Sequence, residues 1–429
     1  MKLADIIDTF ITGDWGEESP TQDTPNAAYC VRGADIVPIT NHNFTDIPQR
    51  YVCDRTKETK LLAAGDLVIE KSGGSPTQST GRIVYVSEDL IKAKGNVVCS
   101  NFCTAFRVKA GWNPLYVYYF WQNVYNYGAF FNFEGKTSGI KNLQLDNALS
   151  AIDIEYLPLE KQNQIVASLA SIDEKIKVNR QINDNLEAMA KQLYDYWFVQ
   201  FDFPNEEGKP YKSSGGAMVW NERLKREIPI GWTCCSIKEL CDINKKTTNK
   251  DEHKQIEYLD TGSITQGYIS NTEIYSVDMA PSRAQRKVED LSILYSSVRP
   301  RLLHYGILST PKENFIVSTG FVTLDAKCKK MALMVYYFLT SNTITEHLAS
   351  IADTAVSSYP SISPDDIAYL DIVIPSNDII QKYNDIVEPM FRKMSTLRKE
   401  IDSLTKQRDE LLPLLMNGQA SVNYHLSDD

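Results

Sequence analysis

Two long stretches of the chain place apolar residues at alternating steps of four and three, and the second lies 218 residues after the first. This spacing is typical of the seam along which coiled-coil helices pack. Because an isolated helix of this length is only marginally stable, we expect the two helices to pair with each other, antiparallel. The predicted seam residues are Ile172, Ile176, Leu186, Leu193 and Trp197 in the first stretch, and Leu397, Ile401, Leu404 and Leu411 in the second.

The same pattern suggests how the two helices align. Pairing the two apolar runs antiparallel about their centres sets Asn179 opposite Arg408. A polar layer inside a seam fixes the register at some cost in stability. We therefore expect leucine at both positions to leave the stability unchanged or to raise it.

Outside these helices the pattern changes to short alternating stretches interrupted by Gly, Pro, Ser and Asn. Residues 67–70, 82–86 and 101–108 are examples, and this pattern is typical of strands. An aromatic-rich helix is predicted at 114–123 and again at 332–341. Strands followed by helices in each half of the chain predict an α+β fold.

The chain also contains an internal repeat. Residues 117–120 and 335–338 both read Val-Tyr-Tyr-Phe, and residues 98–100 match 316–318 at the same offset of 218. Residues 66–69 match 290–293 at an offset of 224. Several similar blocks in one order indicate a duplicated unit. We therefore predict globular domains at 1–155 and 228–374, a central helix at 156–200, a connector at 201–227 and a distal helix with the C-terminal tail at 375–429.

Composition limits the compartment and the partners. The chain has 429 residues and a formal net charge of −10, which predicts weak binding to nucleic acid by the chain alone. The eight cysteines include no Cys-x-x-Cys pair, and we expect reduced thiols and no metal site. With no apolar run of membrane-spanning length and no signal-peptide core at the N-terminus, we expect a cytoplasmic protein.

Motifs for catalysis are weak or missing. The sequence has neither a glycine-rich cofactor loop with an Asn/Asp-Pro-Pro-aromatic motif nor a phosphate-binding loop with its Lys-Ser/Thr ending. Glu58 and Lys60, with Asp46 upstream, imitate the acid/Glu-x-Lys pattern of metal-dependent nucleases. The pattern is short and lies in a polar run, so a solvated surface loop is the preferred interpretation. We predict no catalytic residues.

Several stretches together identify a family. Residues 157–166 (LPLEKQNQIV) enter the first helix, 190–203 (AKQLYDYWFVQFDF) leave it, and 408–418 (RDELLPLLMNG) close the second. Between the halves stand 208–216 (GKPYKSSGG) and 224–232 (LKREIPIGW). In content and order these stretches resemble the specificity subunit of a type I restriction–modification system.

The resemblance implies a set of expectations about function. Such a subunit carries two target-recognition domains, each reading one half of a split site in double-stranded DNA. Its helices form an antiparallel spacer that docks two methyltransferase subunits, which use S-adenosylmethionine to methylate adenine. Separate restriction subunits use ATP and Mg²⁺ to cut, and the specificity subunit itself holds no cofactor. The globular regions vary in such subunits, so the resemblance assigns no individual DNA contact.

Candidates for DNA contact come instead from basic and polar residues on predicted loops, since arginine pairs with guanine edges and lysine mostly with phosphates. The segment around Arg299, Arg301 and His304, at the end of a predicted strand, is the strongest. The full set is Arg50, Lys71, Ser72 and Arg82 in the first half, and Lys245, Lys246, Arg283, Arg299, Arg301 and His304 in the second.

An alternative from another class stays open at this stage. The helices could serve oligomerisation, and the globular parts could bind protein, in a coiled-coil structural or interaction protein without DNA specificity. A nuclease that uses Glu58 and Lys60 is a third and weaker reading. A stoichiometric complex with a methyltransferase that modifies a split site would discriminate among the three.

Overall fold

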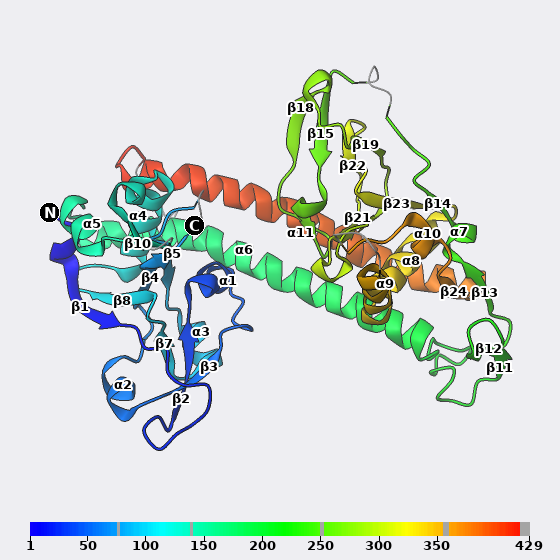
Figure 1. Cartoon of the computed structure of the whole chain (residues 1–429), viewed down its shortest axis with the longest axis horizontal. Helices are drawn as coiled ribbons and strands as arrows, with labels where there is room; N and C mark the ends of the chain where they lie inside the picture. The colour runs from blue at the N-terminus through cyan, green and yellow to red at the C-terminus, as the bar shows by residue number, and fades with distance from the viewer. Residues whose placement is uncertain (75–77, 138–139, 249–252, 355–359, 421–429) are drawn as a thin grey trace, which may run out of the picture. The chain divides into compact units, whose positions relative to one another are not determined.

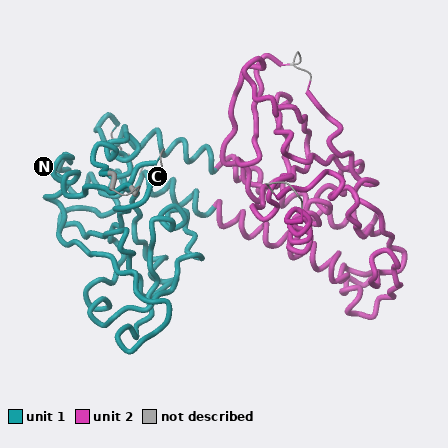
Figure 2. The backbone as a smooth tube through the Cα atoms, in the orientation of Figure 1, with its two compact units in different colours: residues 1–178, 401–429 teal, residues 179–400 magenta. Residues whose placement is uncertain are grey.

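The computed structural model describes residues 1–429 apart from 75–77, 138–139, 249–252, 355–359 and 421–429. Two compact units divide the chain (Figure 2): residues 1–178 with 401–429 form unit 1, and residues 179–400 form unit 2. Both units mix sheets and helices, as predicted.

Unit 1 contains an antiparallel sheet in the order β1 (Ile7–Thr12), β8 (Cys103–Val108), β4 (Leu67–Glu70), β6 (Ile83–Tyr85). A second sheet has the order β3 (Gln49–Val52), β2 (Asn26–Val31), β7 (Val97–Cys99), with β2 and β7 parallel. The shorter elements are α1 (Ile36–Thr40), α2 (Asp54–Thr59), β5 (Ser72–Gly73), α3 (Glu88–Lys94), β9 (Glu134–Thr137), β10 (Ile140–Leu143) and α5 (Leu145–Ala151).

The alternation along β4 assigns its two faces. Leu67 and Ile69 lie in the buried cluster that also holds Trp121 of helix α4 (Pro114–Asn126). Val68 lies in a different buried cluster, with Val84 of β6. Successive side chains of a strand point to opposite faces, so this sheet is covered on both sides. The predicted strand 67–70 and the predicted aromatic helix are therefore confirmed, and the aromatic side chains of α4 form core.

Unit 2 repeats this topology. The sheet β14 (Cys241–Ile243), β23 (Phe321–Ala326), β20 (Ile293–Ser296), β21 (Tyr305–Ile307) matches β1-β8-β4-β6, and helix α8 (Ala332–Leu339) matches α4. The second sheet, β18 (Glu273–Ser276), β15 (Gln255–Leu259), β22 (Phe315–Ser318), β19 (Ala284–Lys287), gains β19 as an extra edge strand. The shorter elements are β11 (Met218–Asn221), β12 (Arg226–Pro229), β13 (Thr233–Ser236), α7 (Ile237–Leu240), β16 (Ile264–Thr265), β17 (Tyr268–Ile269), α9 (Asn342–Thr354), α10 (Pro364–Ala368) and β24 (Asp371–Ile374).

Strand register confirms the repeat and corrects one of its offsets. Leu67 pairs with Phe106 in unit 1, and Ile293 pairs with Leu324 in unit 2. Since Phe106 and Leu324 are 218 residues apart, Leu67 corresponds to Ile293 at an offset of 226, not the predicted 224. The sequence comparison of 66–69 with 290–293 was therefore shifted by two residues. A shift of two keeps each side chain on the same face of the strand, so the apolar pattern still matched.

Helices α6 (Leu159–Tyr194) and α11 (Asn377–Met416) are the two predicted long helices (Figure 1). In unit 1, Leu169 of α6 shares a buried cluster with Leu412 of α11, and further along α6 Ile176 shares one with Ile401. The partner number falls as the α6 number rises, so the helices run antiparallel. In unit 2, the ring of Trp197, in the π-helical turn Asp195–Val199 after α6, lies 5.8 Å from that of Tyr383.

The burial of the seam departs from prediction at one position. Leu411 is exposed, whereas the neighbouring Leu412 and Leu415 are buried in the core of unit 1. Ile401 and Leu412 are eleven residues apart, which corresponds to about 3.67 residues per turn rather than the 3.5 of a heptad repeat. The other predicted seam residues are buried (Ile176, Trp197, Leu397, Ile401, Leu404) or partly buried (Ile172, Leu186, Leu193).

The predicted polar layer is also wrong. Arg408 Nη1 donates to Asp173 Oδ1 at 3.0 Å, six residues before the expected partner Asn179, and the hydroxyl of Tyr119 in α4 donates to Asp173 Oδ2 at 2.6 Å. Apolar residues recur at every turn along both helices, so apolar spacing alone leaves several registers open.

Gln162 fixes the start of α6 on unit 1. Its buried side chain donates to the carbonyls of Leu157 and Gly111 at 2.7 and 3.1 Å, and accepts from the amide of Asn113 at 2.8 Å. Asn113 caps α4, so one glutamine of the 157–166 stretch ties the two helix starts together.

Candidate nucleic-acid interface

Three loops of unit 1 meet where strands β1, β4 and β7 end. The amides of Lys71 and Ser72 donate to the carbonyl of Phe102 at 2.8 and 3.1 Å, and the amide of Asp14 donates to the carbonyl of Cys99 at 2.8 Å. Gly13 is packed so closely that an added Cβ would lie 1.9 Å from the Ser100 oxygen. We call residues 13–16, 71–74 and 100–102 the first loop edge.

Unit 2 builds the same edge from the repeated strands. The amide and hydroxyl of Ser297 both donate to the carbonyl of Gly320 at 2.9 Å, and the amide of Thr319 donates to the carbonyl of Arg283 at 2.8 Å. The amide of Lys287 in β19 donates to the carbonyl of Lys246 at 3.1 Å. We call residues 245–248, 283–287, 297–303 and 318–320 the second loop edge.

Most of the residues predicted to contact DNA lie on these two edges. The first edge holds Lys71 and Ser72, and the hydroxyl of Ser72 contacts the side-chain oxygen of Asn142. Arg50 of β3 lies outside the edge: its guanidinium lies 4.1 Å from the ring of Trp15 and pairs with Glu18 at 3.1 Å. The second edge holds Lys245, Lys246, Arg283, Arg299 and Arg301.

Arg82 does not fit a role in DNA contact. Its Nε and Nη2 donate to the two carboxylate oxygens of Glu70 at 2.8 and 2.6 Å, and Glu70 is 3% exposed. This bond raises the pKa of the Arg82 guanidinium. We assign the pair to the core of unit 1.

Acidic neighbours already occupy several basic side chains of the second edge. Lys245 pairs with Asp242, and Lys246 pairs with Glu289 and, at 3.3 Å, with Asp325. Pairing with Lys245 lowers the pKa of Asp242. DNA phosphates would have to compete with these carboxylates.

Arg299, Arg301 and His304, the strongest candidates from the sequence, make different contacts in the structure. Arg301 pairs with Asp353 and Glu346 of α9 at 2.7 and 3.3 Å, and His304 Nδ1 lies 2.6 Å from the carbonyl oxygen of Ile264. Arg299 is exposed and takes up a left-handed backbone with φ 48°.

Arg286 of β19 differs from these paired residues. Its Nη1 donates to the carbonyl of Asn244 at 3.0 Å, and its Nε is buried without a partner among the residues described. Burial lowers the pKa of this guanidinium, because no carboxylate offsets the cost of desolvation. Among the described residues of unit 1 no strand corresponds to the one that carries Arg286, and this strand was not predicted.

Phe102 was also missed. A strand over 101–108 would have placed it in the core, but β8 begins at Cys103, and Phe102 stands in the loop with 57% of its surface exposed. The Ser-Asn pair before it, typical of a turn, was the available signal.

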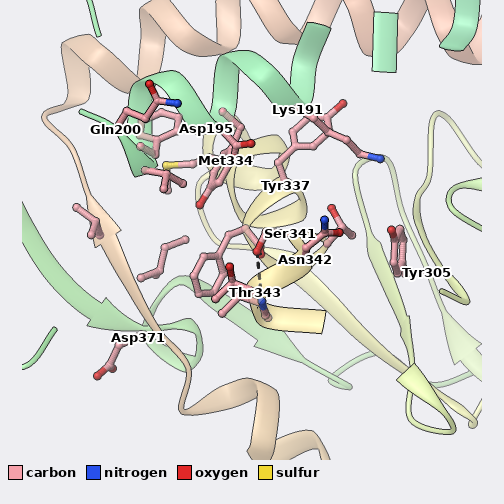
Figure 3. A pocket seen from close by; sticks show the side chains of 18 of the residues that line it. Lys191, Asp195, Gln200, Tyr305, Met334, Tyr337, Ser341, Asn342, Thr343 and Asp371 are labelled. Carbon is pink, nitrogen blue, oxygen red and sulfur yellow. Dashed lines mark hydrogen bonds between the residues drawn. The ribbon is translucent and has the colours of Figure 1, made fainter. Parts of the chain in front are cut away.

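Unit 2 also contains a pocket of about 660 Å³ between the end of α6, the connector and the start of α9 (Figure 3). Burial raises the pKa of Asp195 and lowers that of Arg226, and both line this pocket. The Arg226 guanidinium lies 4.5 Å from the ring of Phe201, and its Nη2 donates to the carbonyl of Val199 at 2.9 Å.

An apolar stripe is duplicated at the ends of the two long helices. On α6, Leu193 lines a shallow hollow with Tyr196, which is 37% exposed. At the repeat offset of 218 these positions become Leu411 and Leu414 of α11, which are 36% and 40% exposed. Each unit therefore presents an apolar surface at the same place in its repeat.

Glu58 and Lys60, the residues of the nuclease-like pattern, lie at the protein surface. Glu58 is exposed on the short helix α2, and the Lys60 ammonium donates to the carbonyl of Gly13 at 3.2 Å. Within the described ranges, no group of three His, Cys, Asp or Glu side chains could hold a metal ion, and no helix is long and apolar enough to cross a membrane.

Comparison with known proteins agrees with the duplicated architecture. Residues 3–188 and 229–406 match the type I restriction modification DNA specificity domain. The chain is 26% identical over 286 residues to the type I restriction enzyme MjaIX specificity subunit of Methanocaldococcus jannaschii, a match that spans 64% of this chain and 62% of that protein. It is 26% identical over 172 residues to the HindI specificity subunit of Haemophilus influenzae, spanning 39% and 37%. These matches cover less than two thirds of either relative.

A solved structure shares the fold. The crystal structure of the S subunit of a type I restriction–modification system from M. genitalium superposes with a TM-score of 0.57 at 15% identity, covering 97% of this chain and 95% of that one. With the domain matched twice along its length, the chain belongs to the family of the type I restriction modification DNA specificity domain.

Proposed function

We propose that this chain is the DNA-recognition subunit of a type I restriction–modification complex, acts in the cytoplasm and catalyses no reaction itself. Each unit reads one half of a split site through its loop edge. The observation that carries the proposal is the duplicated edge: the same strand ends hold different side chains in the two units. Equivalent frames with unlike surfaces suit two unlike half-sites, since half-site geometry mirrors the symmetry of the protein.

Co-expression with methyltransferase subunits tests this proposal. We expect the complex, given S-adenosylmethionine, to methylate adenine in one split motif, and the isolated chain to methylate nothing. Sequencing that detects methylated adenine would give the motif. A stable complex that modifies no split site would favour the alternative, an interaction protein without DNA specificity.

The duplicated apolar stripe is the proposed binding surface for two methyltransferase subunits, one per unit. Restriction subunits, which use ATP and Mg²⁺, would join this complex. We expect Tyr196→Asp and Leu414→Asp each to release one methyltransferase subunit, because a carboxylate placed in a dry interface is costly to desolvate. Native mass spectrometry would count the subunits. Ile274→Asp, at a 69% exposed position on β18, is the control and should keep both.

A further inference from the structure

Phe102 is a large apolar side chain held in water by a fixed backbone. Its carbonyl accepts two backbone hydrogen bonds, from Lys71 and Ser72, and the amide of Cys103 donates to the carbonyl of Ser100 at 2.9 Å. Cys103 itself is fully buried. A single exposed aromatic is common on protein surfaces and by itself needs no explanation. Here the ring stands on the first loop edge, anchored at both sides to the core.

The second loop edge carries no side chain at the equivalent position, and one placed there would have to displace Thr261. Gly320 occupies this position, and an added Cβ would lie 2.9 Å from Cγ2 of Thr261. The carbonyls of Phe102 and Gly320 accept equivalent bonds from the loops after β4 and β20, so the two positions share one backbone frame. The two edges therefore differ in shape as well as in charge.

The charges around Phe102 limit how the first edge could read bases. Lys71 is the one basic residue within the first loop edge as defined. The nearby arginines are engaged: Arg32 donates to both oxygens of Asp35 at 2.9 and 2.8 Å, and Arg82 is bound to Glu70. Arg50, whose guanidinium lies over the ring of Trp15 in this edge, pairs with Glu18 at 3.1 Å. An edge without an available arginine lacks the usual partner for guanine. The apolar feature that a base pair presents in the major groove is the methyl group of thymine.

We propose that Phe102 packs against the 5-methyl group of a thymine in the half-site read by unit 1. This inference rests on the proposed function and adds to it a residue and the chemical group that it reads. Because Gly320 offers no equivalent ring, unit 2 makes no such contact at this position. Thymine at one position of one half-site is the expected result.

The test combines a protein change with a base change. The complex with methyltransferase subunits is prepared with the original chain and with Phe102→Ala, and its binding to the mapped motif is measured with thymine replaced by deoxyuridine at one position at a time. For the original chain, one replacement in one half-site should weaken binding about five- to tenfold, at the lower end of the range for one base contact. With Phe102→Ala, binding is already weaker by a similar factor, and that replacement should have no further effect.

Control variants separate the contact from folding. Tyr127 is 67% exposed at the end of α4 in the same unit and is not among the residues of the first loop edge, so Tyr127→Ala removes a comparable exposed ring and should bind like the original. Phe102→Leu keeps an apolar contact and should keep most of the affinity. Thermal unfolding should be the same for all three variants, because both aromatic side chains are exposed.

The outcomes separate this inference from the proposed function. If Phe102→Ala binds as tightly as the original, or if its loss adds fully to that of every deoxyuridine, the inference is wrong while the split-site function stands. If no deoxyuridine replacement in the half-site read by unit 1 weakens binding of the original chain, the inference is overturned as well. If the complex modifies no split site, the proposed function itself fails.

Discussion

Glu70 is a buried carboxylate whose placement in unit 1 requires both a charged partner and small neighbours. It carries a charge at a 3% exposed position, and its two oxygens accept from Arg82. Two glycines, Gly33 and Gly73, approach it so closely that a Cβ on either would lie 2.5 Å from Oε1. A buried charge is tolerated when a partner of matched geometry neutralises it, and here the backbone around the pair is shaped to admit the carboxylate.

We expect Glu70→Gln to lower the free energy of unfolding of unit 1 by about 3 kcal/mol, because it leaves Arg82 buried without a counter-charge. Denaturant unfolding measures this change. Glu88→Gln, which breaks the exposed pair with Lys92 on α3, should change stability by less than about 0.5 kcal/mol. A Glu70 variant as stable as the Glu88 variant would show that Arg82 is available for other partners.

The DNA candidates show what a sequence can say at this scale. Lys71 and Ser72 were predicted to lie on a loop because glycines follow them; Lys71 lies between strands, whereas Ser72 begins the short strand β5. Arg82 and Arg301 were predicted with the same reasoning, but each is paired with an acid, Glu70 and Asp353, that lies 12 and 52 residues away in the chain. Only the fold decides whether a surface arginine is already occupied.

Elements with strong local patterns were predictable. The strand at 67–70 and the aromatic helices were found because their alternation and composition are properties of the segment itself. Strand β19 was missed because its pairing with β22 at the edge of a sheet is set by distant residues, and edge strands carry a weak pattern. Phe102 was misplaced by a boundary error of two residues, an ordinary error for strand ends.

The two long helices give a prediction at the scale of elements. Arg408, 22% exposed, holds Asp173, so Arg408→Leu should lower stability by about 1–2 kcal/mol. Asn179 is buried and its amide nitrogen has no partner in the described part of the chain, so Asn179→Leu should raise stability by about 1 kcal/mol. The sequence had predicted that leucine at both positions leaves the stability unchanged or raises it. Thermal melts of the single variants measure both changes, and an unchanged or higher melting temperature for Arg408→Leu would contradict a stabilising pair between Arg408 and Asp173.

At the scale of the whole molecule, charge sets how the chain meets DNA. The net charge of −10 and the acids that pair with Lys245 and Lys246 leave few cations to neutralise phosphates. We expect the isolated chain to bind a random duplex with a Kd no tighter than about 1 μM at physiological salt. Titration at several salt concentrations measures both the Kd and its salt dependence. Nanomolar binding by the chain alone would contradict the assignment of these lysines to internal pairs.

The duplication has a consequence for engineering the recognised site. Residues 1–155 contain the first loop edge and most of the core of unit 1, whereas the second loop edge belongs to unit 2. Replacing 1–155 by the matching region of a relative should therefore change one half-site of the methylated motif and keep the other. Mapping methylated adenines gives the readout, and exchange of 228–374 is the converse control. A change in both half-sites after a single exchange would show that the units do not read independently.

The exchange has a condition that the repeat alone would not reveal. Leu412 and Leu415, at the end of α11, pack into the core of unit 1 although they lie more than 240 residues after Leu169, the preceding buried residue of this core in the chain. The donor region must provide an apolar packing surface for these two leucines. Where it does not, each leucine that loses its burial costs about 2 kcal/mol, so the chimera should melt at a lower temperature. Substitutions in the donor region that restore apolar packing around the two leucines should restore the melting temperature. The new half-site should stay unchanged, because stability and base reading depend on different surfaces of the same unit.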